Sequence, residues 1–234
     1  MRIIYTTILL LISLSIIGQK QAKIKFNYSA YKSKEVKKNQ NIKIKKISND
    51  IENALNEISF ELKYDGEISL FETENKMETD YKSTTHELII NMLPKTYIDF
   101  NNKKLYELSE VSGQVFFIEE NFEVSWVMRN NIKIIKGYSC MSAVIKDDKT
   151  GKIMTEAWFT PEIPLNIGPG SYSNLPGLIL LVKNYSSKGE LYSIYEVLDI
   201  DLSKQKKIKL PDLQTITREE YNNFLLGKNK LNNH

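Results

Sequence analysis

The most distinctive part of the chain is Glu156-Ala157-Trp158-Phe159-Thr160-Pro161-Glu162-Ile163-Pro164-Leu165-Asn166-Ile167-Gly168-Pro169-Gly170-Ser171-Tyr172-Ser173-Asn174-Leu175-Pro176-Gly177-Leu178-Ile179. It holds four of the six prolines of the 234-residue chain. Pro161 and Pro164 lack a backbone donor and keep their preceding residues extended, which predicts a stiff connector over 160–170 without regular structure. The run 178–182 is aliphatic without polar alternation, which predicts a strand buried on both faces.

Short strands joined by polar turns account for most of the remaining sequence. Residues 23–31 alternate at period two, and 60–64 and 68–70 flank Asp65-Gly66, a pair typical of a type I′ hairpin turn. Further strands are predicted over 88–90, 97–100, 105–108, 115–118, 122–127, from 132, and over 138–145, 153–160, 178–182 and 191–200. This spacing predicts a mainly β fold, an antiparallel meander that forms a strongly curved sheet, an open barrel or a sandwich.

Two helices interrupt the β pattern. Ile44, Ile47, Ile51, Leu55 and Ile58 recur at three and four residues, and Ser48-Asn49-Asp50 offer N-cap oxygens, so we expect a helix over 48–58. Near the C-terminus, Thr217-Arg218-Glu219-Glu220 fits a capping box and predicts a short helix, followed by a polar tail over 228–234.

Residues 1–18 have the pattern of a secretory signal peptide. Arg2 precedes a short apolar core, and Gly18 offers a small residue for cleavage. A buried first strand or a retained membrane helix is the alternative, but the apolar run is short for a stable anchor. We therefore expect an exported protein, periplasmic or at the cell surface, with a single β-rich domain over 19–234 and no transmembrane span after signal cleavage.

The segment 19–47 is strongly basic. It contains ten lysines and one glutamate, whereas the whole chain has a net charge of only +3. Such a segment can bind an anionic surface such as lipid headgroups, but a solvated lysine-rich surface is the preferred interpretation. The segment lacks the arginine clusters and interleaved aromatics typical of nucleic-acid sites, so no nucleic-acid partner is expected.

Residues 158–164, Gly168-Pro169 and Leu175-Pro176-Gly177-Leu178-Ile179 resemble the signature of the GLPGLI family, exported proteins of diderm bacteria with no established activity. Similarity extends upstream to Gly137-Tyr138-Ser139-Cys140. Asn174 stands where the eponymous motif begins with glycine, and asparagine is the least costly replacement if that position needs a positive φ. The resemblance implies neither a cofactor nor catalytic residues.

The sequence contains few groups suited to catalysis. A dyad of Cys140 with His86 is conceivable, but a lone cysteine on a strand is more often a buried thiol. Glu156 and Glu162 are interpreted as surface charges, and Asp147-Asp148 as turn residues. No nucleophile elbow, phosphate loop or metal motif is present, so we expect no cofactor and no metal site.

We therefore predict a non-catalytic binding or accessory protein of the cell envelope that holds an apolar ligand or lipid. The candidate ligand-binding residues are Trp158, Thr160, Pro161, Glu162, Leu175, Pro176 and Gly177. Trp126 and Trp158 are more often core anchors than ligand contacts. Two alternatives remain: a structural partner of an outer-membrane transporter or secretion assembly, and an enzyme whose site includes Cys140 or the acidic residues near Trp158.

Overall fold

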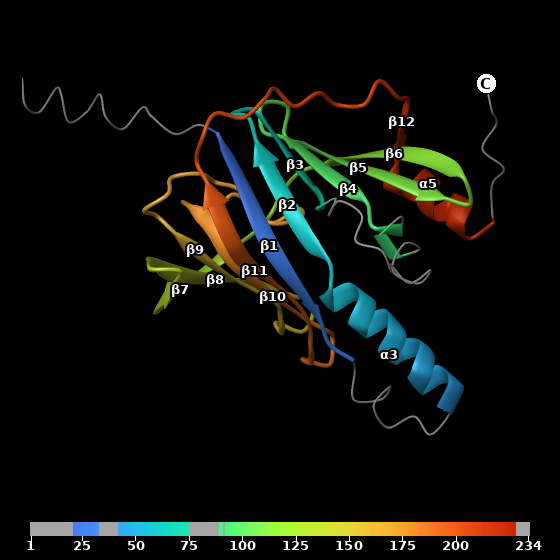
Figure 1. Ribbon diagram of the computed structural model, residues 1–234, viewed down its shortest axis with the longest axis horizontal. Helices are drawn as coiled ribbons and strands as arrows, with labels where there is room; N and C mark the ends of the chain where they lie inside the picture. The colour runs from blue at the N-terminus through green and yellow to red at the C-terminus, as the bar shows by residue number, and fades with distance from the viewer. Residues whose placement is uncertain (1–20, 33–41, 75–88, 91, 228–234) are drawn as a thin grey trace, which may run out of the picture.

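The computed structural model describes residues 21–32, 42–74, 89–90 and 92–227, and the proposed signal peptide, His86 and the C-terminal tail lie outside them. The described strands form one sheet in the order β12-β6-β5-β4-β3-β2-β1-β11-β10-β9-β8-β7. Neighbouring strands are antiparallel except β12 and β6, and the strongly curved sheet is open, because β12 and β7 end it on opposite sides (Figure 1). The predicted mainly β, curved antiparallel architecture is therefore confirmed.

The strands are β1 (Ala22–Ala30), β2 (Ser59–Tyr64), β3 (Ile68–Thr73), β4 (Lys95–Asp99), β5 (Lys104–Val111), β6 (Gln114–Asn121), β7 (Val127–Ile135), β8 (Tyr138–Lys146), β9 (Ile153–Thr160), β10 (Leu178–Tyr185), β11 (Leu191–Asp201) and β12 (Thr215–Thr217). The helices are α3 (Ile42–Asn56) and α5 (Arg218–Leu225). β1 and β2 cross the front of the molecule between the two halves of the sheet, and α3 projects from their lower end (Figure 1).

The β2–β3 hairpin forms as predicted, but its turn is not type I′. Tyr64 pairs with Ser69, and only Gly66 in the turn has a positive φ, of 101°. The Asp65 carboxylate instead closes the turn by accepting the backbone N–H groups of Glu67 and Ile68, each at 2.9 Å. A type I′ turn requires two residues with positive φ. Here only one has it, and hydrogen bonds to the Asp65 side chain stabilise the turn instead.

Three sequence predictions need correction, and one strand was missed. Helix α3 begins at Ile42, since the three- and four-residue spacing of Ile44 and Ile47 continues past the polar Ser48-Asn49-Asp50. Ile89 and Ile90 are helical rather than extended. Residues 122–126 form no strand: the Phe122 N–H bonds Lys103 O at 3.0 Å, and the Trp126 indole reaches the connector instead of a ladder. The short β12 was not predicted.

The connector between β9 and β10 has the irregular structure predicted for it. Residues 161–177 contain no helix or strand, and Ile163, Leu165 and Ile167 are buried in the main hydrophobic cluster with Trp158 and Leu180. Ile163 O and Ile167 O accept the backbone N–H groups at the start of β10, at 2.9 and 3.0 Å. The connector therefore covers part of the core. Residues 178–182 are buried throughout, as predicted.

The C-terminal segment ties the two halves of the sheet together. Residues 202–214 run along the top of the view in Figure 1 from β11 to β12, and on the way Ile208 N donates to Asp65 Oδ2 at 2.8 Å. Helix α5 begins with the predicted capping box between Thr217 and Glu220. Its Arg218 pairs with Glu120 at 3.0 Å and with Glu107, so the helix is anchored to β5 and β6.

Candidate functional site

A pocket of about 270 Å³ lies where the two halves of the sheet face each other. Its tyrosines come from β1, from β11 and from the connector, and its phenylalanines come from β2 and β3. We call it the tyrosine pocket, and its principal lining residues are Tyr28, Tyr172, Tyr192 and Tyr195 with Phe60 and Phe71. Polar groups of Asn184, Ser193, Thr96 and Glu107 also reach it.

Strand register brings the aromatic rings together. Tyr28 on β1 is the direct partner of Tyr195 on β11, so their side chains emerge on the same face of the sheet with ring centroids 4.9 Å apart. Phe60 lies 5.6 Å from Tyr195 and is stacked on Phe71 at 4.9 Å. These contacts give the pocket a continuous aromatic wall that is fixed by four packed strands.

The other end of the pocket is a network of polar side chains. Thr155, Asn184 and Ser193 are cross-strand partners in one row over β9, β10 and β11. The Asn184 Oδ1 accepts hydrogen bonds from the hydroxyls of Thr155 at 3.1 Å and Tyr172 at 2.7 Å, and its Nδ2 donates to Ser193 Oγ at 3.0 Å. The amide is therefore held in one orientation beside the aromatic wall.

Burial keeps three tyrosines of the pocket protonated at neutral pH. Burial raises the pKa of Tyr28, Tyr172 and Tyr195, and for Tyr28 a hydrogen bond with Ser193 opposes the rise only in part. Tyr195 is half-buried and lines the pocket, and its protonated hydroxyl can donate a hydrogen bond to an acceptor on a ligand.

Two neighbouring elements complete the pocket. The connector contributes Gly170, Ser171 and Tyr172, and Gly170 has a φ of +60° that turns the chain toward the pocket. On the opposite side Glu107 is held by Arg218 of α5. Arg218 donates hydrogen bonds to the Glu120 and Glu107 carboxylates, and these bonds raise the pKa of its guanidinium.

The seven residues predicted from the sequence do not line this pocket. Trp158, Thr160 and Leu175 are buried in the core, whereas Pro161, Glu162 and Pro176 are exposed, and Gly177 lies against the backbone of Thr160. Lys133 Nζ lies 5.0 Å from the Trp158 ring centroid, and the Trp158 Nε1 has no partner among the described residues. A ligand role for these seven residues stays a prediction.

The tyrosine pocket itself was missed by the sequence analysis. Its wall joins Tyr28 near one end of the described chain to Tyr195 near the other, and only the pairing of β1 with β11 brings them together. The sequence signal is limited to tyrosines within two predicted strands, Tyr28 in 23–31 and Tyr195 in 191–200, and many half-buried strands contain such residues.

Cys140, Glu162 and Asp147 each take part in the packing or the hydrogen bonding of the fold. Cys140 is fully buried, and burial raises the pKa of its thiol, which opposes thiolate chemistry. Glu162 accepts the Ser139 N–H at 2.7 Å, and Asp147 accepts Thr150 N and Oγ1, both at 2.7 Å, as a turn residue. Over the part of the chain that the structure describes, no three metal-ligating side chains gather.

Fold and pocket together define a single-sheet β protein with an aromatic-lined cavity. Residues 145–181 match the model of a family described as a protein of unknown function (Porph_ging). This match covers β9, the connector and the start of β10, the same stretch that is most distinctive in the sequence. No curated protein matches the chain.

Solved structures of PNGF-II share the fold. The structure of PNGF-II in the P21 space group aligns with a TM-score of 0.56 at 14% identity, over 90% of this chain and 34% of that one. PNGF-II in the C2 space group gives 0.52 at 14% identity, over 89% and 33%. This chain thus spans about a third of PNGF-II, and the likeness concerns fold alone.

A LolA superfamily protein, NE2245 from Nitrosomonas europaea, aligns with a TM-score of 0.29 at 8% identity, over 83% of this chain and 89% of that one. That score is too low to support an argument about this chain. No helix among the described residues is long and apolar enough to cross a membrane.

Proposed function

We propose that this chain is an exported, non-catalytic binding protein of the cell envelope that holds a small amphipathic ligand in the tyrosine pocket. The observation that carries the proposal is a cavity of about 270 Å³ with an aromatic wall at one end and a fixed hydrogen-bonding network at the other. Concave sites with apolar walls and a few converging polar groups are the usual form of small-molecule sites. Export rests on the pattern of residues 1–18 alone.

The pocket volume limits the size of the ligand. A cavity of roughly 150 Å³ holds a benzene molecule, and ligand pockets range from about 300 to 1,000 Å³. The 270 Å³ of the tyrosine pocket therefore suits a molecule with one or two rings, not a lipid with two acyl chains.

The chemistry of the lining specifies the parts of the ligand. The faces of Phe60, Phe71 and Tyr195 favour a flat apolar or aromatic body. The protonated Tyr28 and Tyr195 hydroxyls favour an acceptor on that body, such as a carbonyl, carboxylate or sulfonate. A purely aliphatic ligand would offer the Tyr195 hydroxyl no acceptor and bind more weakly.

The test is a calorimetric titration with naphthalene-2-sulfonate, which joins two fused rings to an acceptor group. Ser171 lines the pocket, so Ser171→Phe should place a ring in its mouth and weaken probe binding about tenfold or more. The matched control is Ser187→Phe, which adds the same ring on an exposed turn and should leave the affinity unchanged.

Circular dichroism and thermal unfolding must show that both variants are folded. Equal probe affinity in the two variants, or saturable binding by neither the variants nor the unaltered chain, would refute a ligand role for the pocket. Export is tested separately by cell fractionation of the full chain, for which recovery only from the cytosol is the contrary result.

A further inference from the structure

A second cavity lies beside the turn between β4 and β5. It has a volume of about 390 Å³ and shares no lining residue with the tyrosine pocket, and we call it the turn pocket. Phe100, Phe122 and Val124 give it an apolar lining, in which the two phenylalanine rings lie edge to face with their centroids 6.3 Å apart. A flat apolar group can pack against these rings.

Hydrogen bonds hold together the three segments that form the turn pocket. The Phe122 N–H donates to Lys103 O at 3.0 Å, which ties the segment after β6 to the β4–β5 turn. The Trp126 indole donates to Ser173 O at 2.7 Å, which ties the same segment to the connector. The cavity is therefore built into the fold, and a ligand does not have to order it.

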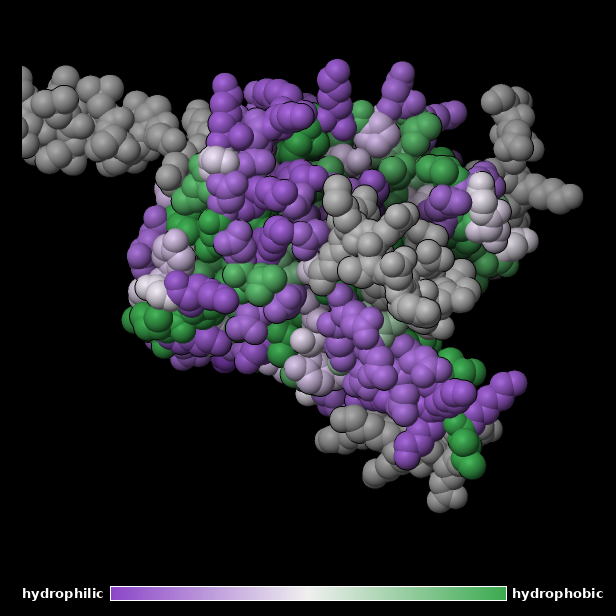
Figure 2. All heavy atoms as spheres, viewed as in Figure 1, coloured by the Kyte–Doolittle hydropathy of each residue, from purple (hydrophilic) through white to green (hydrophobic). Residues whose placement is uncertain are grey.

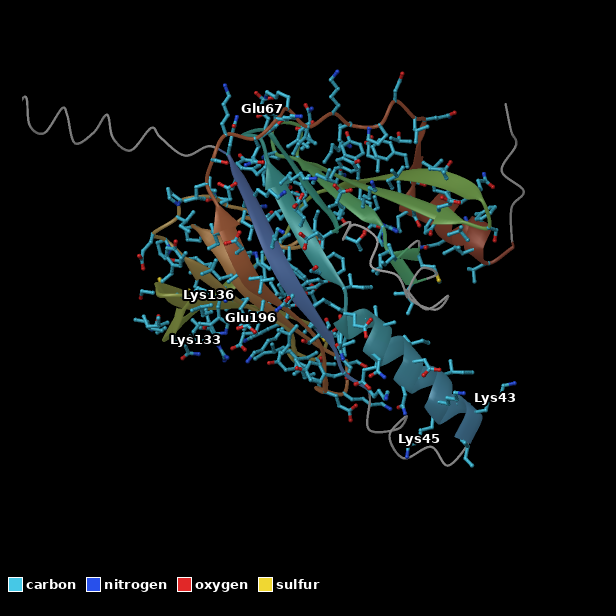
Figure 3. All side chains as sticks on the ribbon, viewed as in Figure 1. Lys43, Lys45, Glu67, Lys133, Lys136 and Glu196 are labelled. Atoms are coloured by element: carbon cyan, nitrogen blue, oxygen red, sulfur yellow. The ribbon has the colours of Figure 1, made fainter. Side chains whose placement is uncertain are left out.

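The turn pocket lies at the upper end of the molecule in the view of Figure 3. The Phe100 N–H donates to Glu67 O at 3.1 Å, and Glu67 is labelled at the top of that view. Figure 2 shows hydrophilic side chains projecting along the same edge. An apolar cavity with a few polar groups around it is the usual form of a site for a small molecule.

The rim of the turn pocket carries one charge of each sign. Lys103 and Glu123 both line the cavity, but they form no ion pair with each other or with another described residue. The carboxylate of Asp99, at the start of the same turn, is engaged by the N–H groups of Asn101 and Asn102, each at 3.0 Å. The cavity therefore presents a separate cation and anion beside its aromatic lining.

Two residues of the rim have a backbone conformation that glycine adopts at a lower cost. Lys103 has a φ of 53° and Asn174 a φ of 67°, and they are two of the four described non-glycine residues with a positive φ. Such residues gather at ligand sites, where the side chain is needed despite the strain. The lysine ammonium and the asparagine amide are both donors that a carboxylate can accept.

We propose that the turn pocket binds a zwitterionic α-amino acid with an aromatic side chain. The ring packs against Phe100 and Phe122. The carboxylate accepts hydrogen bonds from Lys103 and Asn174, and the ammonium group donates to Glu123. A ligand with a single charge would place that charge near the rim group of the same sign and leave the other rim group without a partner.

The volume of the cavity agrees with a ligand of this size. A benzene molecule occupies a cavity of roughly 150 Å³, so 390 Å³ holds one ring together with the α-amino acid group. This site is separate from the tyrosine pocket, and the proposal does not depend on the ligand proposed there.

The test is a calorimetric titration of the full chain with L-phenylalanine and two analogues. N-acetylphenylalanine lacks the ammonium group, and phenylalanine amide lacks the carboxylate. Phenylalanine should bind saturably and about threefold or more tightly than either analogue, which is the size of effect expected for charges at an exposed rim. An affinity no higher than that of both analogues, or no saturable binding, would overturn the proposal.

Two variants assign each charge of the ligand to its partner. Lys103→Gly should weaken phenylalanine binding about threefold and remove the preference over phenylalanine amide, whereas Glu123→Gln should remove the preference over N-acetylphenylalanine. Lys103→Gly should not lower the thermal stability, because glycine accepts a φ of 53°. Asn174→Gly is a second variant of this kind, at a φ of 67°, and should also weaken phenylalanine binding.

The matched control is Lys136→Gly. It removes the same charge at a φ of 50°, from the turn between β7 and β8, and Lys136 is labelled far from Glu67 in Figure 3. Phenylalanine affinity should be unchanged in this variant, and a loss equal to that of Lys103→Gly would contradict the assignment. Displacement of phenylalanine by naphthalene-2-sulfonate would place the amino acid in the tyrosine pocket and also overturn the proposal, whereas failure of naphthalene-2-sulfonate to bind would count against the tyrosine pocket alone.

Discussion

Single side chains set the local geometry at several places in this fold. Asn174 adopts a φ of +67°, so asparagine occupies the left-handed position inferred for the first residue of the signature turn. Asp65 is only 3% exposed, and its carboxylate accepts backbone N–H groups from Glu67, Ile68 and Ile208. One carboxylate thereby closes a hairpin and also holds the C-terminal segment.

Replacing Asp65 should make the protein less stable at neutral pH. In Asp65→Asn the amide Nδ2 can occupy the position of Oδ2, where it meets the Ile208 N–H as a second donor, and the charge is lost. We expect a loss of about 1–3 kcal/mol in the free energy of unfolding, measured with urea at pH 7.

The same replacement should change the response to acid. Burial by itself raises the pKa of Asp65, but the three backbone donors and Lys207 lower it overall. The stabilisation is therefore present above the unfolded-state pKa of about 3.9 and disappears as the pH falls through the lower folded-state pKa. The difference between the two proteins should shrink below about pH 4, and a constant difference would contradict the assignment.

At the scale of elements, the connector between β9 and β10 covers part of the hydrophobic core. Its isoleucines at 163 and 167 are buried, and Gly177 precedes the first residue of β10. A Cβ on Gly177 would lie 2.0 Å from the Thr160 carbonyl oxygen, at a φ of +151°. The glycine is thus required by close contact between two backbone segments.

Gly177→Ala should therefore be strongly destabilising. We expect a loss of about 3 kcal/mol or more in the free energy of unfolding, because neither backbone segment can move without breaking β-ladder hydrogen bonds. Gly151→Ala is the control: this glycine has a φ of +66°, but no atom lies within 4 Å of the added Cβ, so the cost should be only about 1–2 kcal/mol. Equal losses in the two variants would show that backbone conformation, not the contact with Thr160, decides the effect.

How much of these elements the sequence could predict depends on the range of the interactions involved. Period-two strands, the capping box at Thr217 and the apolar strand 178–182 follow from neighbouring residues, and they are confirmed. The three-residue strand β12 could not be predicted, since it pairs with β6 in parallel across a long separation in sequence. The contact of Asp65 with Ile208 could not be predicted either, because the two residues are far apart in sequence.

At the scale of the whole molecule, the topology of the sheet creates the tyrosine pocket. β1 lies between β2 and β11, so strands from the beginning and end of the chain pair side by side. This arrangement places Tyr195 against Tyr28 and Phe60, and the connector adds Tyr172 from a third region. The residues that line the pocket are far apart in sequence, so no local sequence pattern predicts it. The sequence analysis therefore placed the candidate ligand site at Trp158 and its neighbours.

The most direct measurement is a tyrosine-labelled NMR spectrum recorded during titration with naphthalene-2-sulfonate. We expect saturable shifts of the Tyr28, Tyr172 and Tyr195 ring signals, which line the pocket, while Tyr106 and Tyr138, which do not line it, remain unshifted. Shifts confined to Tyr106 or Tyr138, or spread over all the tyrosines without saturation, would contradict the account.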